Sequence, residues 1–335
     1  MFHALILAAS VALTPAQVDS VVVNAEAAFH TYIFPDVAAK AVAVLKERAS
    51  TYRTISDPEA LAKAMTTDLY AVTHDKHVHI EYPFDPSQFG DASQPNPAQM
   101  HQFDQLINSG FLTVRRLRGN IGYIDFREFS DDEEVGQVID AAMTFVSHTD
   151  ALIIDVRKNG GGSPRAAQTL EAYFFDQPQQ ITSLMIRDPK TGIVTETQQY
   201  TNATVPGPLY LNKPIYLLTS SRTFSCAEQF TYDLHNLKRV TIVGETTGGG
   251  ANPGAFLSLG NSFGIFVPNG RAYSPITKTN WEGTGIAPDV ATSAADALTR
   301  AYVIALTAAQ PHAKDPELVE EIKRGLANPA DALVP

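Results

Sequence analysis

Residues 214–229 have the sequence PIYLLTSSRTFSCAEQ, from Pro214 to Gln229. The mostly apolar run at 214–219 is typical of a short buried strand. The polar residues after it predict a turn, and the following pattern predicts a helix over 226–237. A strand that leads through a short turn into a helix is the repeating unit of α/β proteins.

The same pattern occurs earlier in the chain, around a turn that contains three glycines. A strand is predicted at 151–156, followed by Asn159-Gly160-Gly161-Gly162 and by a helix over 165–175. Further strands at 121–126 and 239–243 and a helix over 133–147 continue the alternation, which predicts an α/β core. The segments 193–198, 256–259 and 262–267 are predicted to add hairpins, and the last forty residues to be helical.

The N-terminal part has a different pattern. Apolar residues recur at helical spacing over 18–69, and Asp57-Pro58-Glu59 has the residues that commonly begin a helix. Residues 77–82 alternate like a half-buried strand whose polar face carries His77, His79 and Glu81. We therefore predict a signal peptide at 1–16, a helical N-terminal domain at 17–82 that ends in this strand, a linker or loop at 83–110, a core at 111–300 and a helical C-terminal tail at 301–335.

Composition excludes several classes of protein. The 335 residues are 44% hydrophobic, which is enough for a substantial core and argues against disorder. A net charge of −11 argues against nucleic acid and acidic membrane surfaces as partners. The single cysteine, Cys226, excludes an intrachain disulfide and a multi-cysteine metal site.

The first residues resemble a cleavable leader. Ten apolar residues at 4–13 precede Thr14-Pro15-Ala16, which fits a signal peptide cleaved after Ala16. A buried N-terminal helix is the alternative, because no Lys or Arg precedes the run. The leader predicts a periplasmic or secreted protein, and the absence of a later run of 18 apolar residues predicts no membrane association once it is removed.

Two turns could carry chemistry. Ser225 lies at the start of the predicted helix, where backbone N–H groups stabilise negative charge. Ser225 and Glu228 also have capping-box spacing, so the serine could have only a structural role. The three glycines of the Asn159–Gly162 turn let backbone N–H groups approach a ligand, which suits phosphate or an oxyanion, and the turn lacks the spacing of nucleotide-binding loops.

Histidines and one acidic loop complete the candidates. His74, His77 and His79 could form a zinc site with Asp75 or Glu81, or a solvated strand face, or one of them could act alone as a general base. Residues 274–289 form a turn-rich segment with the only tryptophan, Trp281, and with Glu282. By composition alone it is a surface loop with a solvated Glu282.

Taken in order, five motifs resemble the S41 peptidase family, which includes tail-specific proteases, the tricorn protease and interphotoreceptor retinoid-binding protein repeats. They are Asp75-Lys76-His77, Asp155-x-Arg157-x-Asn159-Gly-Gly-Gly, Thr223-x-Ser225-x-x-Glu228, Gly244-Glu245-Thr246-Thr247-Gly248 and Asn280-Trp281-Glu282-Gly283-x-Gly285-x-x-Pro288-Asp289. The resemblance covers about residues 17–300 and implies a ClpP/crotonase-like α/β core. The helical domain without a PDZ domain is most similar to the bacterial retinoid-binding-protein-like branch.

The resemblance implies a role for each candidate residue. Ser225 matches the nucleophile, and the N–H groups of Cys226 and Gly161 match the oxyanion hole. Gly250 occupies the position at which the tail-specific branch has its lysine base. A Ser-Lys dyad is therefore excluded. The tricorn-like branch uses a histidine and a glutamate that match His77 and Glu282, with Asp75 as an alternative orienting acid. Lys76 occupies the position of a serine in the proposed tricorn tetrad, so we assign no fourth member there.

These assignments predict a serine endopeptidase that acts through an acyl-enzyme on peptides or unfolded proteins, with no cofactor and no metal. Oligomers are possible, because tricorn-like relatives assemble. The alternative is a non-catalytic module of the same fold that binds an apolar ligand or a peptide. Cys226 is disfavoured as the nucleophile because the motif places Ser225 at that position.

Overall fold

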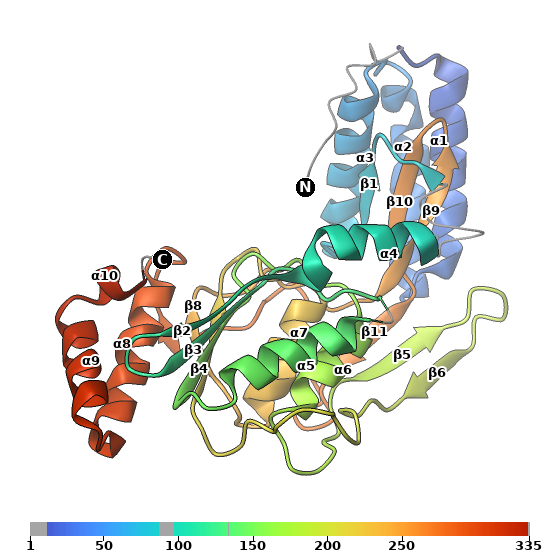
Figure 1. The fold of residues 1–335 in the computed structure, drawn as a ribbon. Coiled ribbons are helices and arrows are strands. Elements are labelled where there is room, and N and C mark those ends of the chain that lie inside the picture. Colours follow the sequence, from blue (N-terminus) through green and yellow to red (C-terminus); the bar gives the residue numbers. More distant parts are fainter. Residues whose placement is uncertain (1–11, 87–96, 133, 334–335) are drawn as a thin grey trace. The chain divides into compact units, whose positions relative to one another are not determined.

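The computed structural model describes residues 12–86, 97–132 and 134–333. Its contacts divide the chain into two compact units, each assembled from three segments (Figure 1). The first unit comprises Met1–Asn96, Met185–Thr195 and Asn252–Arg271, and the second comprises Pro97–Leu184, Glu196–Ala251 and Ala272–Pro335. Residues 252–271, which fall within the predicted core segment 111–300, thus belong by contacts to the first unit.

Three helices and a small antiparallel sheet build the first unit. The helices are α1 (Pro15–Ala28), α2 (Pro35–Tyr52) and α3 (Pro58–Thr73), with a 3₁₀ turn η1 (Phe29–Thr31) after α1. Asp57 caps α3 by accepting a hydrogen bond from the Ala60 N–H, and Pro58 occupies its first turn, as the sequence predicts. The sheet has the order β1–β10–β9, with bounds His79–Glu81, Phe263–Pro268 and Gly254–Gly260.

One hydrophobic core joins the helices of the first unit to that sheet. Val21, Leu45 and Leu69, one from each helix, are fully buried together with Phe263 and Ile265 of β10. The late segment around β9 and β10 therefore completes the core that the N-terminal helices begin.

A six-stranded sheet forms the centre of the second unit. Its order is β12–β8–β7–β4–β3–β2; the strands are parallel except that β2 is antiparallel to β3. The bounds are β2 (Phe111–Leu117), β3 (Ile121–Phe126), β4 (Ala151–Asp155), β7 (Ile215–Thr219), β8 (Thr241–Gly244) and β12 (Val290–Ala291).

Alternating side chains of these strands pack into two separate cores, because successive residues of a strand point to opposite faces. Ile154 and Leu217 contribute to the core beneath α5 (Val135–Val146), α6 (Pro164–Ala172) and α7 (Cys226–Asn236). Ile153 and Leu218 contribute to the core beneath α8 (Ala297–Ala309) and α9 (Pro316–Ala327). The second unit is thus a sheet between two helical layers (Figure 1), which confirms the predicted α/β fold.

The remaining elements are short or peripheral. They are α4 (Pro97–Leu106), η3 (Asn108–Gly110), η4 (Gln310–His312), α10 (Pro329–Leu333) and a sheet of order β11–β5–β6, with bounds Gly270–Tyr273, Ser183–Arg187 and Val194–Thr197. Helix α4 falls inside the segment predicted as a linker. The helical C-terminal segment begins at Ala297, and α8 packs against the sheet.

The predicted leader lies mostly outside the described residues, which begin at 12. Thr14 caps α1 through a capping box with Gln17, and Pro15 and Ala16 form the first turn of that helix. Cleavage after Ala16 would therefore remove this cap. Among the described residues, no helix is both long and apolar enough to cross a membrane.

Candidate active site

Ser225 occupies a constrained turn between β7 and α7. Its backbone has φ 54° and ψ −123°, a conformation that is unfavourable for any residue with a β carbon. The side chain is partly exposed, whereas Thr223 before it and Cys226 after it are buried. The Ser225 side chain thus lies at the N-terminal end of α7, where the helix dipole favours negative charge.

Glu228 fixes this turn from within the helix. Its carboxylate accepts hydrogen bonds from the Ser225 N–H at 3.1 Å, the Gly249 N–H at 2.6 Å and the Gly250 N–H at 2.8 Å, and another from the Thr247 hydroxyl. The predicted pairing of Ser225 with Glu228 is therefore present. Burial raises the pKa of the Glu228 carboxyl, although these four hydrogen bonds oppose the rise. Glu228 thus ties the serine turn to the glycine segment 248–250.

The turn with three glycines lies directly against Ser225. Gly161 has φ +114°, and a Cβ added to it would lie 2.8 Å from the Ser225 Cβ and 3.0 Å from the Cys226 nitrogen. The fully buried Asn159 holds the turn, since its carbonyl accepts from the Phe224 N–H at 3.1 Å and its Oδ1 accepts from the Gly161 N–H at 2.9 Å. Three predicted site residues, Ser225, Cys226 and Gly161, are thereby brought together.

Cys226 is poorly suited to be the nucleophile. The residue is 5% exposed, and burial raises the pKa of its thiol well above the usual value, with the acidic Glu171 and Asp233 adding to the effect. The thiol is therefore protonated near neutral pH, and a protonated thiol is a weak nucleophile. Its backbone nitrogen, rather than its sulfur, lies beside Gly161.

His77 belongs to the first unit and lies in the turn between α3 and β1. The predicted strand at 77–82 thus begins two residues later, at His79. The His77 ring stacks on Phe266 of β10 with a centroid separation of 5.5 Å. Burial, with a smaller contribution from His79, lowers the pKa of His77 to about 4. A neutral imidazole at neutral pH can accept a proton.

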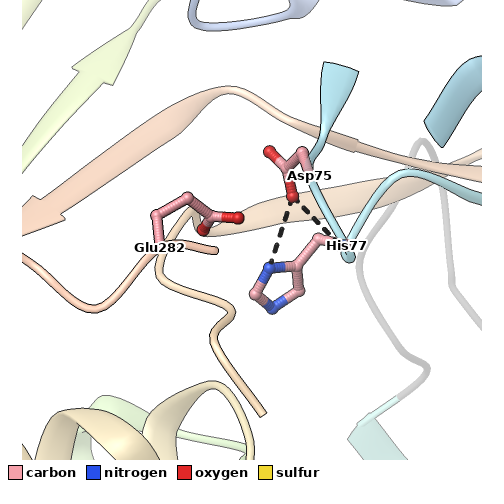
Figure 2. A group of neighbouring side chains, drawn as sticks. All are labelled: Asp75, His77 and Glu282. Carbon is pink, nitrogen blue, oxygen red and sulfur yellow. Dashed lines mark hydrogen bonds and ion pairs between the residues drawn. The ribbon is translucent and has the colours of Figure 1, made fainter. Parts of the chain in front are cut away.

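Asp75 lies beside His77 in the same unit (Figure 2). Its Oδ1 accepts a hydrogen bond from the His77 backbone N–H at 3.0 Å and lies 3.8 Å from the ring Nδ1. Tyr32 Oη and Asn252 Nδ2 both donate to Asp75 Oδ2, at 3.1 and 2.9 Å. Burial raises the pKa of Asp75, while the hydrogen bonds from Asn252, His77 and Tyr32 lower it.

The zinc interpretation of the histidines gains no support from their positions. His74 ends α3 in the left-handed region, with φ 53°. His79 Nδ1 lies 2.7 Å from the His77 carbonyl oxygen and donates to it. Within the described part of the chain, the ligand atoms of His74, His77 and His79 do not gather into one group.

Glu282 lies in a loop of the second unit that is exposed over much of 274–289, as expected of a surface loop, but Glu282 itself is not fully solvated. Trp281 is only 2% exposed and donates through its Nε1 to the Gly250 carbonyl at 2.7 Å. Glu282 is partly buried, and its Oε2 accepts from the Ala251 N–H at 2.6 Å. The loop therefore lies along the same glycine segment that Glu228 binds.

Sequence reasoning missed the supporting residues around these candidates. Tyr32 and Asn252, which bind Asp75, come from positions 43 residues before it and 177 residues after it. Glu228 was expected only to cap the helix, whereas it also binds Gly249 and Gly250. The sequence pattern that could have identified Glu228 is an acid three residues after Ser225. No sequence pattern pointed to Tyr32 or Asn252.

Comparison with known families agrees with the fold. The model of peptidase family S41 matches residues 120–292, and that of the N-terminal domain of Peptidase_S41 in eukaryotic IRBP matches residues 2–113. The chain therefore belongs to peptidase family S41.

Two curated relatives are processing proteases. The chain is 26% identical over 170 residues to carboxyl-terminal-processing peptidase 1 from the chloroplast of Arabidopsis thaliana, and 24% identical over 188 residues to a carboxy-terminal-processing protease of Bartonella bacilliformis. These matches cover 51% and 52% of this chain but only 33% and 39% of the relatives. The chain thus spans well under half the length of either relative.

Solved structures support the fold alone. A Parabacteroides merdae protein assigned as a peptidase matches with a TM-score of 0.55 and 18% identity, over 96% of this chain and 100% of that one. A lipoprotein from Streptococcus agalactiae matches with a TM-score of 0.53 and 15% identity, over 80% and 88% of the two chains. The same architecture therefore occurs in proteins with different descriptions, so function must be argued from the site.

Proposed function

We propose that this protein is a serine endopeptidase in which Ser225 forms an acyl-enzyme with the carbonyl of the scissile peptide bond. The observation that carries the proposal is the constrained turn at Ser225, with Gly161 against it and the Cys226 nitrogen beside both. A reactive hydroxyl and backbone donors at one helix start are what acyl transfer needs.

His77 is proposed as the general base, and the proposal requires it to reach Ser225 from the first unit. The imidazole takes the proton of Ser225 Oγ as the oxygen attacks, and then gives that proton to the leaving amine. Water attacks the acyl-enzyme in the second half of the reaction, with His77 again taking the proton. The lowered pKa keeps the ring neutral at neutral pH, and it also makes the imidazole a weaker base than an ordinary histidine.

Glu282 is proposed to orient His77 and to stabilise the imidazolium that forms. Asp75 is the competing candidate, because it lies beside His77 within the same unit. Its Oδ1 is 3.8 Å from the ring Nδ1 of His77. That separation exceeds a normal hydrogen bond, so Asp75 would need to shift to orient the ring directly. Its contact with the His77 backbone instead supports a role in positioning the turn.

The oxyanion is proposed to bind the N–H groups of Cys226 and Gly161. The Gly161 N–H currently donates to Asn159 Oδ1, so substrate binding must exchange or share this hydrogen bond. A donor already in place when charge develops needs no reorganisation, whereas the Gly161 N–H must first give up or share its hydrogen bond to Asn159. We also propose export through the leader at 1–16, which N-terminal sequencing of the mature protein would test.

Labelling with a fluorophosphonate probe tests the proposed nucleophile. We expect one adduct per chain, located on Ser225 by peptide mass spectrometry, and loss of both adduct and casein hydrolysis in Ser225→Ala. His77→Ala should slow labelling by about 10²–10⁴-fold, the usual contribution of a general base.

Ser221→Ala is the matched control, because Ser221 is an exposed serine of the same turn region. It should label and hydrolyse like the wild type. If the folded mature protein gave no Ser225 adduct, the peptidase proposal would fail and a non-catalytic binding module would be favoured.

A further inference from the structure

The first unit contains a cavity of about 350 Å³ that the proposed reaction does not use. It lies within that unit, between the end of α1, η1, the start of α2 and β5. Its lining combines apolar residues, among them Phe29, Tyr32 and Ala38, with His30 and the charged Glu26 and Arg187. The volume is at the lower end of the range for small-ligand pockets, about 300–1,000 Å³.

The floor of the cavity is apolar. Phe29 and Tyr32 are each 1% exposed and Ala38 is 8% exposed, so these side chains are fixed in the core of the unit. A rigid apolar floor favours an aliphatic or aromatic group of matching size, because such a group is removed from water when it binds.

Arg187 provides a cation at the wall. Its Nη1 donates to the His30 carbonyl, and its backbone N–H donates to the Asn269 carbonyl at 2.8 Å, which fixes the residue at both ends. Within the described residues, no carboxylate lies within ion-pair distance of this half-buried guanidinium. Arg187 retains further donors suited to a carboxylate.

Glu26 provides an anion in the same cavity. Its side chain is 21% exposed, and its ion-pair partner is the 65% exposed Lys46, at 3.8 Å. A long exposed pair of this kind contributes little energy, so a ligand ammonium could join or replace Lys46. The cavity thus has one site for each charge of a small zwitterion.

We propose that this cavity binds a free α-amino acid with an apolar side chain, such as leucine. The α-carboxylate pairs with Arg187, the α-ammonium pairs with Glu26, and the side chain lies over Phe29 and Tyr32. A fatty acid would satisfy Arg187 but would leave Glu26 facing a hydrocarbon. The proposal does not depend on the peptidase activity.

Calorimetric titration of the full-length chain with L-leucine tests the proposal. We expect saturable binding of one leucine per chain, with leucinamide and N-acetylleucine each bound about 10-fold to 100-fold more weakly, because each loses one charge-assisted pair. Arg187→Gln and Glu26→Gln should weaken leucine by similar factors, and Arg187→Lys should restore part of the affinity.

Arg300→Gln is the matched control, since Arg300 is exposed on α8 in the second unit. We avoid Tyr32 as a test because its hydroxyl also binds Asp75. If Arg187→Gln fails to fold, the proposal is tested by the wild type alone, from its relative affinities for leucine, leucinamide and N-acetylleucine.

Three outcomes would overturn the proposal: no saturable binding of millimolar leucine, N-acetylleucine bound as well as leucine, or decanoate bound more tightly than leucine. Repeating the titration with Ser225→Ala separates the two proposals. Leucine should still bind to this variant, whatever its activity.

Discussion

The Cα of Gly161 faces Ser225 so closely that a β carbon at position 161 would lie 2.8 Å from the Ser225 Cβ. The two residues belong to turns after different strands, β4 and β7, which are paired in parallel in the central sheet. Parallel strands end at the same edge of a sheet, and this brings the glycine turn to the serine. Only a residue without a side chain fits there.

Gly161→Ala should therefore impair both the fold and the reaction. The new methyl group meets Ser225 while the backbone stays at φ +114°, so we expect a loss of about 1–3 kcal/mol in the free energy of unfolding. Displacement of an oxyanion donor should lower kcat by about 10²–10³-fold. Urea unfolding and peptide hydrolysis measure the two effects.

Gly136→Ala is the control for that substitution. Gly136 lies in α5, and a β carbon there would meet no atom within 4 Å. Alanine should stabilise the helix by about 0.5–1 kcal/mol and leave kcat unchanged. Equal kcat values for Gly161→Ala and Gly136→Ala would show that the reaction does not require glycine at position 161.

Glu228→Gln should loosen the serine turn. A glutamine has one acceptor oxygen where the carboxylate accepts four hydrogen bonds, and its NH₂ group would face N–H donors. We expect the free energy of unfolding to fall by about 1–3 kcal/mol and the rate of fluorophosphonate labelling to fall with it. Glu320→Gln, an exposed acid on α9, should change stability by less than about 0.5 kcal/mol.

Glu282→Gln and Asp75→Asn distinguish the two candidate orienting acids. If Glu282 orients His77, the Glu282→Gln substitution should lower kcat by about 10²–10⁴-fold with little change in KM. Asp75→Asn should have the smaller effect on kcat and the larger effect on stability, because the Asp75 carboxylate accepts three hydrogen bonds. The opposite ranking of the two kcat values would assign the orienting role to Asp75.

The dependence of kcat/KM on pH should report His77 of the free enzyme. Because burial lowers the pKa of His77 to about 4, the imidazole is neutral from neutral pH down to that value. Activity should therefore persist through pH 5–6 and decline only as the pH falls through about 4. Circular dichroism over the same range separates protonation from unfolding, and a decline near pH 6.5 would show that the acting imidazole is solvated.

Glu171 and Asp233 should make the protein less stable as the pH rises. Burial raises the pKa of Asp233 to about 7 and that of Glu171 well above its usual range, so the folded chain keeps protons that the unfolded chain releases. The free energy of unfolding should fall between about pH 4 and pH 8. Neither Glu171 oxygen makes a hydrogen bond within the described residues, so Glu171→Met should stabilise by about 1–3 kcal/mol at pH 8. An unchanged urea midpoint in Glu171→Met at pH 8 would contradict the inference that the buried Glu171 carboxyl destabilises the folded protein at that pH.

Local patterns predicted the elements of the second unit well. The predicted strand at 214–219 covers β7, and the apolar run at 151–156 covers β4. Both strands are buried on two faces, which makes their sequences continuously apolar and easy to recognise. Helix α4 was missed because its first residues still belong to a stretch rich in turn-forming residues that runs to Gln99.

Long-range hydrogen bonds could not be predicted in the same way. Glu282 was expected to be solvated because its neighbours are turn-forming residues, but Trp281 anchors the loop through the Gly250 carbonyl. The partners of Asp75 are similarly remote in sequence. The local composition of a segment predicts turns. Whether the resulting loop is buried depends on the distant segment against which it packs.

The division of the chain into interleaved units has a consequence for its biosynthesis. The core around the N-terminal helices requires Leu259, Phe263 and Ile265, which the ribosome adds after Ser225 has been made. A nascent chain, or a fragment that ends before residue 252, would contain the serine turn but not a finished unit around His77. Under the proposed mechanism, an incomplete chain is therefore inactive, and the cell is protected from premature proteolysis while the protein is being translated.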